Sequence, residues 1–367
     1  MKVLELFAGA GGAALGLEAA GLEHAALCEW NADACATLRA AGLGPVVEGD
    51  VRDLDAIESV AGAGPLDLLW SSFPCQAWSQ AGDRRGAEDD RNGWPWTVDA
   101  IDRFRPRWFL AENVRGLIQH SEDGHPNPAH CPRCYFERVI LAQLRERFAC
   151  VGWWLLDAAD YGVPQHRRRV IIWAGPAPLR APRPTHGAPS KARQRDMFGP
   201  GVLPWVSMGE ALGLGSARAM LPNRKPPIDC TDRPSPTIDN HAGQTGEKYE
   251  QALRITTLGL GGAKVIRGDR NPQRAGPWVL HHMRNTEAHP NQERPTLSTE
   301  PSPTVGGAGN QCAEGQTFRR RLTVEECATL QAFPSGHPWQ GSKSSRYRQV
   351  GNAVPPLLAQ AVVSVLP

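Results

Sequence analysis

The sequence has no apolar run that approaches the roughly 20 residues needed to span a membrane. Its first five residues enter a strand pattern directly, without the basic and then apolar order of a secretory signal. The nine cysteines are odd in number and follow no regular spacing, which favours reduced thiols over a disulfide framework. We therefore expect a cytoplasmic protein that has no membrane association.

The sequence also has little excess of either charge. Its formal net charge is +2, so the total does not point to any class of partner. Two short basic clusters stand out, residues 167–169 and 319–321. Such clusters either meet phosphates or form a solvated face.

Strand and helix patterns alternate over residues 1–175, and the amino-acid composition then changes. The alternation predicts an α/β fold, a doubly wound and mostly parallel sheet that is covered on both faces. Residues 176–310 are rich in Pro, Gly, Arg, Asn and Thr, and we expect residues 176–339 to form a smaller, irregular second domain with short strands and long loops. Within it, Thr323 and Glu326 have the spacing of a helix capping box. Residues 340–367 are expected to return to the first domain.

A glycine-rich turn follows the first predicted strand, residues 2–7. Its residues, from Phe7 through Ala8, Gly9 and Gly11 to Gly12, let the backbone approach a ligand and open a helix. Glu29 ends the second strand about 20 residues later, where a ribose hydroxyl needs an acceptor. The pattern indicates a cofactor that contains adenosine.

Three residues near these strand ends have two interpretations each. Trp30 either stacks on an adenine ring or packs in the core. Asp50 follows the third strand and either accepts from an adenine amino group or caps the helix over residues 54–60. Cys75 follows the apolar strand 66–70 and Pro74, and is either a nucleophile at the ligand-binding edge of the sheet or a small buried hydrophobe. The charged loop after it, residues 80–92, is expected to close over a substrate.

Two further strands carry polar side chains. Glu112 follows an apolar run in the predicted strand 107–114 and is either a proton-bearing carboxyl or the partner of a nearby arginine. In the segment 161–169, alternation places Gln165, Arg167 and Arg169 on one face.

A Cys/His cluster lies after residue 112 and looks like an insertion. Its four potential zinc ligands fall within ten residues: His125, His130, Cys131 and Cys134. The cluster is either a structural zinc site or a plain loop with two free thiols.

Taken together, six segments resemble the cytosine-C5 DNA methyltransferase family in their order along the chain. They are Phe7–Gly12, Pro74-Cys75-Gln76, Glu112-Asn113-Val114, the Gln165/Arg167/Arg169 set, residues 321–334 and residues 351–355. Two departures are visible: Glu5 stands where the family usually has Asp, and Trp94-Pro95-Trp96 follows the loop.

The resemblance implies a reaction and a set of roles. A Cys75 thiolate would add to cytosine C6, Glu112 would protonate N3, and Arg169, supported by Arg167, would bind the O2 edge of the base. C5 would then attack the methyl group of S-adenosylmethionine, with the target base flipped out of the duplex. The residues implied for the cofactor site are Phe7, Ala8, Gly9, Gly11, Gly12, Glu29, Trp30, Asp50, Val51, Pro74, Asn352 and Val354.

The resemblance also implies partners and leaves alternatives. It implies double-stranded DNA as the substrate, a monomer associated with the nucleoid, and a cognate restriction endonuclease as a candidate partner. Residues 1–175 with 340–367 would be the catalytic, cofactor-binding domain, and residues 176–339 the target-recognition domain. One alternative is transfer to cytosine of a tRNA, and another is a nicotinamide-dependent oxidoreductase that uses the glycine turn and Glu29.

Overall fold

The computed structural model describes residues 1–74, 92–119, 131–188, 201–213, 232–235, 237 and 322–367 in full. It also gives the backbone of four strands, residues 218–221, 228–229, 254–258 and 317–321. Cys75 and the loop 80–91, His125 and His130 lie outside the described residues.

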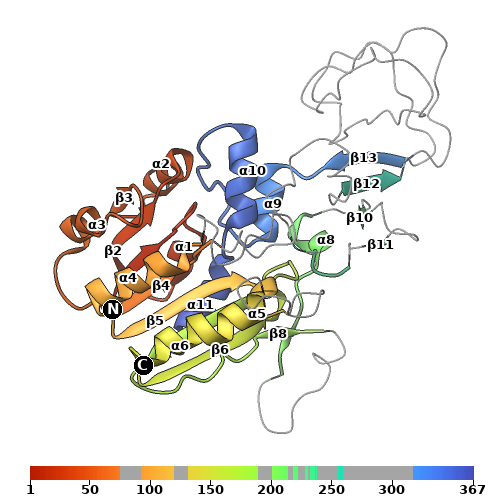
Figure 1. The fold of residues 1–367 in the computed structure, drawn as a ribbon. Coiled ribbons are helices and arrows are strands. Elements are labelled where there is room, and N and C mark those ends of the chain that lie inside the picture. The colour runs from red at the N-terminus through yellow and green to blue at the C-terminus, as the bar shows by residue number, and fades with distance from the viewer. Residues whose placement is uncertain are drawn as a thin grey trace.

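A seven-stranded sheet forms the centre of the molecule (Figure 1). Five strands run parallel, and β7 is antiparallel to both of its neighbours, so the predicted doubly wound and mostly parallel α/β sheet is confirmed. Its order is β3 (Val46–Glu48), β2 (Glu23–Glu29), β1 (Lys2–Leu6), β4 (Leu68–Ser71), β5 (Trp108–Val114), β7 (Arg168–Gly175) and β6 (Cys150–Asp157).

Helices cover both faces of this sheet because its strands are apolar on both faces. Along β4, Leu68 and Trp70 pack on one side and Leu69 on the other. The first side carries α1 (Gly12–Ala19), α2 (Ala32–Ala40) and α11 (Pro356–Val363), and the second carries α3 (Leu54–Ala61), α4 (Trp94–Phe104) and the helix from α5 (Pro132–Tyr135) to α6 (Leu141–Arg145). A π-helical turn, η5 (Phe136–Ile140), joins α5 to α6.

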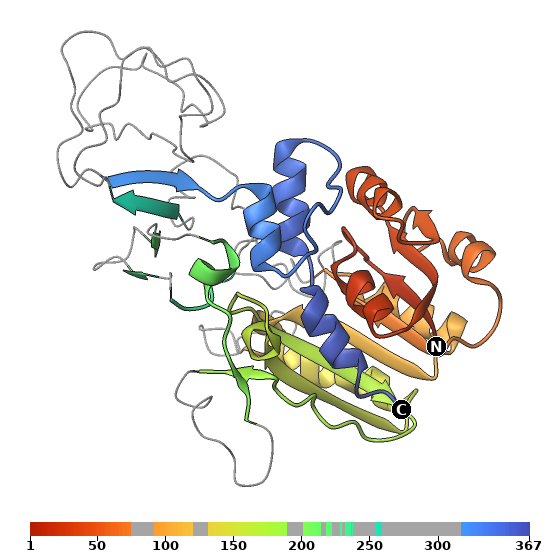
Figure 2. The same cartoon turned by 180° about the vertical axis from the view of Figure 1, so that it is seen from behind.

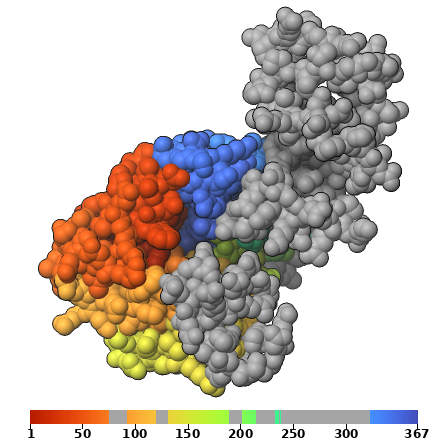
Figure 3. Space-filling model, turned by 45° about the horizontal axis from the view of Figure 1, so that its top comes forward, coloured from red at the N-terminus to blue at the C-terminus, as the bar shows by residue number. Residues whose placement is uncertain are grey.

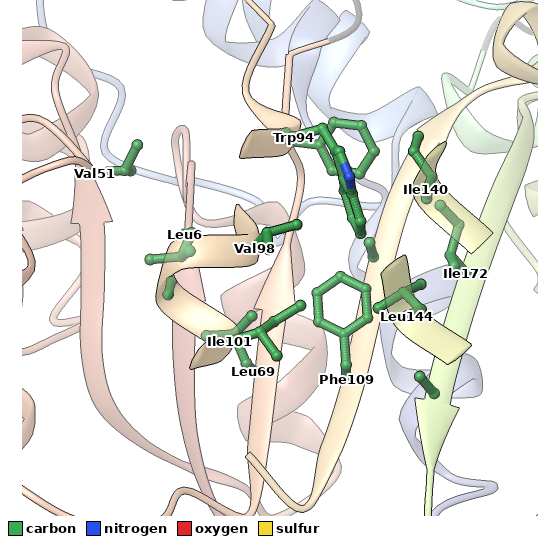
Figure 4. Packing of buried hydrophobic residues seen from close by; sticks show 14 of the residues in the cluster. Leu6, Val51, Leu69, Trp94, Val98, Ile101, Phe109, Ile140, Leu144 and Ile172 are labelled. Atoms are coloured by element: carbon green, nitrogen blue, oxygen red, sulfur yellow. The ribbon is translucent and has the colours of Figure 1, made fainter. Parts of the chain in front are cut away.

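The second face packs around aromatic rings. Trp94 of α4 and Phe109 of β5 meet edge to face at 6.2 Å, and Ile140 and Leu144 lie beside them (Figure 4). Full burial of such side chains stabilises the fold by about 2 to 3 kcal/mol each. The second face therefore fixes α4 and α6 on the sheet.

The C-terminal helices complete the N-terminal half of the chain. The last helix, α11, packs against α1 on the sheet (Figure 2), and residues of the two ends lie side by side on the surface (Figure 3). Glycines allow this approach: a Cβ on Gly16 would collide with the backbone oxygen of Pro356. The remaining helices here are α9 (Val324–Leu330) and α10 (Lys343–Asn352), and α9 begins with the predicted capping box of Thr323 and Glu326.

Short strands dominate what is described between residues 186 and 321. A four-stranded antiparallel sheet has the order β11 (Ile228–Asp229), β10 (Arg218–Leu221), β12 (Arg254–Leu258) and β13 (Thr317–Arg321). A small parallel pair joins β8 (His186–Gly187) to β9 (Leu203–Pro204), and α8 (Met208–Ala211) follows. Two 3₁₀ turns, η3 (Arg115–Ile118) and η6 (Ala158–Tyr161), follow β5 and β6.

Candidate functional site

The predicted site residues gather where the parallel strands end. Phe7 follows β1, Glu29 ends β2, Pro74 lies three residues after β4, and Glu112 lies near the end of β5. Parallel neighbours bring their carboxyl ends to one edge of the sheet, and the strand order reverses between β1 and β4. In open α/β sheets this switch point is where ligands bind.

The glycine turn after β1 has a left-handed backbone. Phe7, Gly9 and Gly11 have φ values of 59°, 57° and 86°, and Gly11 is the N-cap of α1 without a side-chain cap. A Cβ added to Gly9 would meet nothing within 4 Å, so this glycine borders open space. A Cβ on Gly12 would instead collide with the backbone oxygen of Val354. Gly9 is thus the glycine positioned for backbone contact with a ligand, whereas Gly12 serves packing.

Glu29 holds this turn through backbone hydrogen bonds. Its Oε2 accepts from Gly9 N at 2.7 Å, and its Oε1 accepts from Trp30 N and Asn31 N at 3.0 and 2.9 Å. These bonds use three of the about four acceptor positions of a carboxylate. Burial raises the pKa of Glu29, and the three backbone N–H groups oppose the rise.

Trp30 projects into solvent beside Glu29. The residue is 79% exposed, so the interpretation of Trp30 as a packed core residue is wrong. A large exposed indole next to an open glycine turn provides a face on which a purine ring can stack.

Asp50 and Val51 follow β3 and differ in environment. Asp50 forms an ion pair with Arg52, whose hydrogen bond lowers the pKa of the carboxyl. The cap of α3 is Asp53, which accepts from Ala56 N, so the interpretation of Asp50 as that cap is wrong. Val51 is buried in the core.

Glu112 and Arg169 form an ion pair across β5 and β7. Glu112 Oε1 lies 2.6 Å from Arg169 Nε, and each residue is 8% exposed. Burial lowers the pKa of the Arg169 guanidinium, and Glu112 opposes this change. The predicted carboxyl is thus paired with an arginine, and that arginine is itself a predicted site residue.

The alternation predicted for residues 165–169 is present. Gln165, Arg167 and Arg169 are buried, whereas Arg168 is exposed. Arg167 does not extend to the same place as Arg169: its Nη2 donates to Gly351 O at 2.8 Å. Arg167 therefore joins the sheet to the end of α10.

Residues 351–355, the last of the six segments, begin at this contact between Arg167 and the end of α10. Asn352 is exposed at the end of α10, while the side chain of Val354 is buried in the apolar cluster around α11. Asn352 is therefore the residue of this segment whose side chain is available to a ligand.

The described part of the nucleophile motif is fixed by β5. Asn113 Nδ2 donates to Phe73 O at 3.1 Å, and Pro74 is half-buried. Asn113 is a site residue that the sequence motifs did not single out. The sequence feature that could have identified Asn113 is its position between Glu112 and Val114, at the end of β5 and next to the segment that precedes Pro74-Cys75-Gln76.

A segment of the predicted recognition region contacts the arginine segment. Ser235 N donates to Pro164 O at 2.9 Å, and His166 N donates to Ser235 O at 2.7 Å. The Thr237 hydroxyl donates to His166 O at 2.8 Å. These bonds join Ser235 and Thr237 to the backbone of Pro164 and His166, on either side of Gln165.

The Cys/His cluster is described only at its second half. Cys131 and Cys134 are buried, reduced and in mutual hydrogen-bond contact, which raises the pKa of Cys134. Within the part of the chain that the structure covers, no group of three or more His, Cys, Asp or Glu side chains is arranged to hold a metal. Zinc at this cluster stays a prediction, which metal analysis of the purified protein tests.

Comparisons with known proteins cover nearly the whole chain. The family model described as "C-5 cytosine-specific DNA methylase" matches residues 1–366. Two curated relatives are each 32% identical: Type II methyltransferase M.NaeI of Lentzea aerocolonigenes, aligned over 99% of this chain and 73% of its own, and M.Eco47II of Escherichia coli, over 98% and 77%.

Solved structures share the fold at lower identity. The S. pombe Dnmt2 methyltransferase has a TM-score of 0.58 at 15% identity, covering 100% of this chain and 98% of its own. The Entamoeba histolytica methyltransferase EhMeth has a TM-score of 0.57 at 13% identity, covering 100% and 99%. No helix among the described residues is long and apolar enough to cross a membrane.

Proposed function

Because the chain belongs to the C-5 cytosine-specific DNA methylase family, we propose that it methylates C5 of cytosine in a specific duplex DNA sequence through a covalent adduct at Cys75. The relatives named as type II methyltransferases support a role beside a restriction endonuclease. Family membership also removes the nicotinamide-dependent alternative. We further propose that the protein acts as a monomer on nucleoid DNA in the cytoplasm.

The buried Glu112–Arg169 pair is the observation that carries the proposal. Its two groups lie 2.6 Å apart on adjacent strands, and Asn113 links the same strand to Phe73, two residues before Cys75. A carboxylate and a guanidinium so placed offer one planar ring a group that can take up and return a proton, together with two or more N–H donors.

The residues around the glycine turn fit S-adenosylmethionine. Trp30 offers an exposed face for the adenine, Glu29 keeps acceptor capacity for a ribose hydroxyl, and Gly9 borders open space. Asp50 follows β3, and Asn352 is an exposed polar residue next to Ala353 and Val354, which lie against Gly12 of the turn. When bound, the cofactor would supply the electrophilic methyl group.

The roles in the proposed reaction follow from the chemistry of cytosine. C5 is a poor nucleophile until a thiolate adds to C6, and Cys75 supplies that thiolate. Glu112 takes up the proton that the Cys75 thiol loses, passes it to N3 as negative charge builds on the ring and takes it back after methylation, and Arg169 holds both Glu112 and the O2 edge. Transfer of the C5 proton to water then leaves the C5–H electrons to form the C5=C6 double bond, and the Cys75 sulfur leaves C6 with the electrons of the C–S bond. Since none of these atoms can be reached inside a duplex, the target base is flipped out.

Methyl transfer from labelled S-adenosylmethionine tests the proposal. Wild-type protein should label C5 of cytosine in DNA, Cys75→Ser should not, and the conservative control Cys150→Ser should retain activity because Cys150 lies on the edge strand β6. Bisulfite sequencing of DNA from cells that express the protein gives the target sequence. Label on a base nitrogen, or in tRNA in place of DNA, would contradict the proposal.

A further inference from the structure

Pro74, the residue before Cys75, packs directly against the start of α4. A Cβ added to Gly93, the N-cap of α4, would lie only 2.6 Å from Pro74 Cδ and 3.0 Å from Phe7 Cζ. Carbon atoms do not approach this closely, so the position has no room for a side chain. Gly93 therefore sets how far Pro74 and Phe7 can move towards α4.

A buried amide fixes the backbone around Gly93. Asn92 Nδ2 donates to the hydroxyl of Tyr135 at 2.8 Å, and Asn92 Oδ1 accepts from Trp94 N at 3.3 Å. Asn92 and Tyr135 are each 6% exposed. The Asn92 amide thus links the Tyr135 hydroxyl to the backbone N–H of Trp94, so that hydrogen bonds hold the residues before and after Gly93.

Tyr135 ends α5, and the chain that continues from it through α6 to Arg147 is joined to α4 at two further points. Trp94 Nε1 donates to Gln143 Oε1 at 2.7 Å, and Arg147 Nε lies 2.6 Å from Asp102 Oδ1. The ring of Tyr135 belongs to the apolar cluster on this face, where a phenylalanine would bury the same ring. The hydroxyl is therefore needed for Asn92 rather than for packing.

We propose that Tyr135 is a positioning residue for the nucleophile segment: its hydroxyl fixes Asn92, Asn92 fixes Gly93, and Gly93 bounds Pro74 next to Cys75. This inference rests on the proposed function, in which Cys75 attacks cytosine. Tyr135 touches neither cytosine nor the cofactor in this scheme. Displacement of a reacting group by about 1 Å can slow a reaction by up to about a hundredfold. Loss of the Tyr135 hydroxyl is therefore expected to slow methyl transfer even though Tyr135 does not touch the reacting atoms.

The test compares two buried tyrosines that differ in their place in the fold. Tyr135→Phe removes the hydroxyl that accepts from Asn92. Tyr161→Phe is the matched control, because Tyr161 is 7% exposed and its hydroxyl donates to Pro182 O at 3.0 Å on the opposite face of the sheet. Each variant is assayed for single-turnover methyl transfer to DNA, for S-adenosylmethionine affinity and for thermal stability.

At saturating S-adenosylmethionine, Tyr135→Phe should slow single-turnover transfer by about tenfold, and Tyr161→Phe should transfer at the wild-type rate. Asn92→Ala combined with Tyr135→Phe should be no slower than Asn92→Ala alone, because both changes break one link. Equal rates in the two tyrosine variants, after correction for any loss of folded protein, would overturn the proposal.

A second measurement separates this inference from the proposed function. Alkylation of Cys75 by iodoacetamide, followed by peptide mass spectrometry, does not require methyl transfer. Cys75 should react faster in Tyr135→Phe than in wild type or Tyr161→Phe, because Pro74 is less constrained. If the wild-type protein transfers no methyl group, the proposed function fails and the alkylation rates alone decide the inference; equal rates in all three proteins would overturn it.

Discussion

Glu112 Oε1 lies 2.6 Å from Arg169 Nε, and both side chains are almost completely removed from solvent. Each charge depends on the other, because an isolated buried charge is strongly disfavoured. In the proposed reaction the same two groups act on the base. Stability and chemistry are therefore linked at this pair, and a suitable set of variants separates them.

Glu112→Gln should destabilise the protein by about 3 kcal/mol and abolish methyl transfer, because Arg169 is left buried without an anion. The double variant Glu112→Gln/Arg169→Met removes both charges and should recover much of the lost stability, yet remain inactive. Denaturant unfolding and label transfer measure the two properties. Activity in the double variant would exclude a chemical role for the pair.

Arg167→Met should act through stability. Loss of its bond to Gly351 O leaves a buried carbonyl without this donor, which costs about 2 kcal/mol. Specific activity per folded molecule should fall far less than in Arg169→Met. Arg168→Met is the control from the same segment: this residue is exposed, and the change should stay within about 0.5 kcal/mol. Equal loss of activity in the Arg167 and Arg169 variants would instead place Arg167 at the base.

Trp30→Ala should weaken binding of S-adenosylmethionine without weakening the fold. Loss of one aromatic stacking partner costs about 1 kcal/mol, or about fivefold in Kd, and the exposed side chain contributes little to the core. Calorimetric titration measures the affinity. Leu155→Ala, which shortens another exposed apolar side chain on β6, should leave the Kd unchanged.

Stability should fall as the pH rises above about 6.5, because of His24. Burial alone would lower the pKa of His24, but its contact with Glu5 at 3.3 Å and the charges of Glu5 and Glu18 raise it above the usual 6.5. A raised pKa means that the folded state binds the proton more tightly, so its contribution is complete below the unfolded pKa and is lost as the pH passes the folded one.

Glu18→Gln removes one of the two carboxylates near His24 and should flatten this pH dependence. Thermal unfolding measured between about pH 6 and 9 gives the pH dependence of stability. This range begins just below the usual pKa of histidine. An unchanged slope in this variant would show that another group controls stability there.

Local patterns explain which parts of the fold were predictable. The mostly parallel sheet follows from apolar runs separated by helical spacing, and the capping box of Thr323 and Glu326 follows from a four-residue signal. The helix from α5 to α6 was not predicted, since its π-helical turn breaks the usual spacing of apolar residues. The apolar residues of this helix therefore do not follow the single 3.6-residue period from which a helix is predicted.

Partners that are distant in sequence explain what was missed in the site. Arg167 donates to an oxygen 184 positions away, and Asn92 donates to a hydroxyl 43 positions away. No spacing rule specifies such pairs, because they depend on how the helices settle on the sheet. The exposure of Trp30 was likewise one of two open interpretations, since periodicity does not tell how far a side chain projects past a strand end.

The hydrogen bond from Gln360 Nε2 to Ala19 O joins residues 341 positions apart, where α11 covers α1. A ribosome that adds about 5 to 20 residues per second makes these two helices roughly 20 to 70 seconds apart. During that time the nascent chain exposes the face of α1 that α11 will cover, a surface open to chaperones or to aggregation. Slower translation, for example at low temperature, lengthens this exposure, so the yield of folded protein depends on the rate of translation.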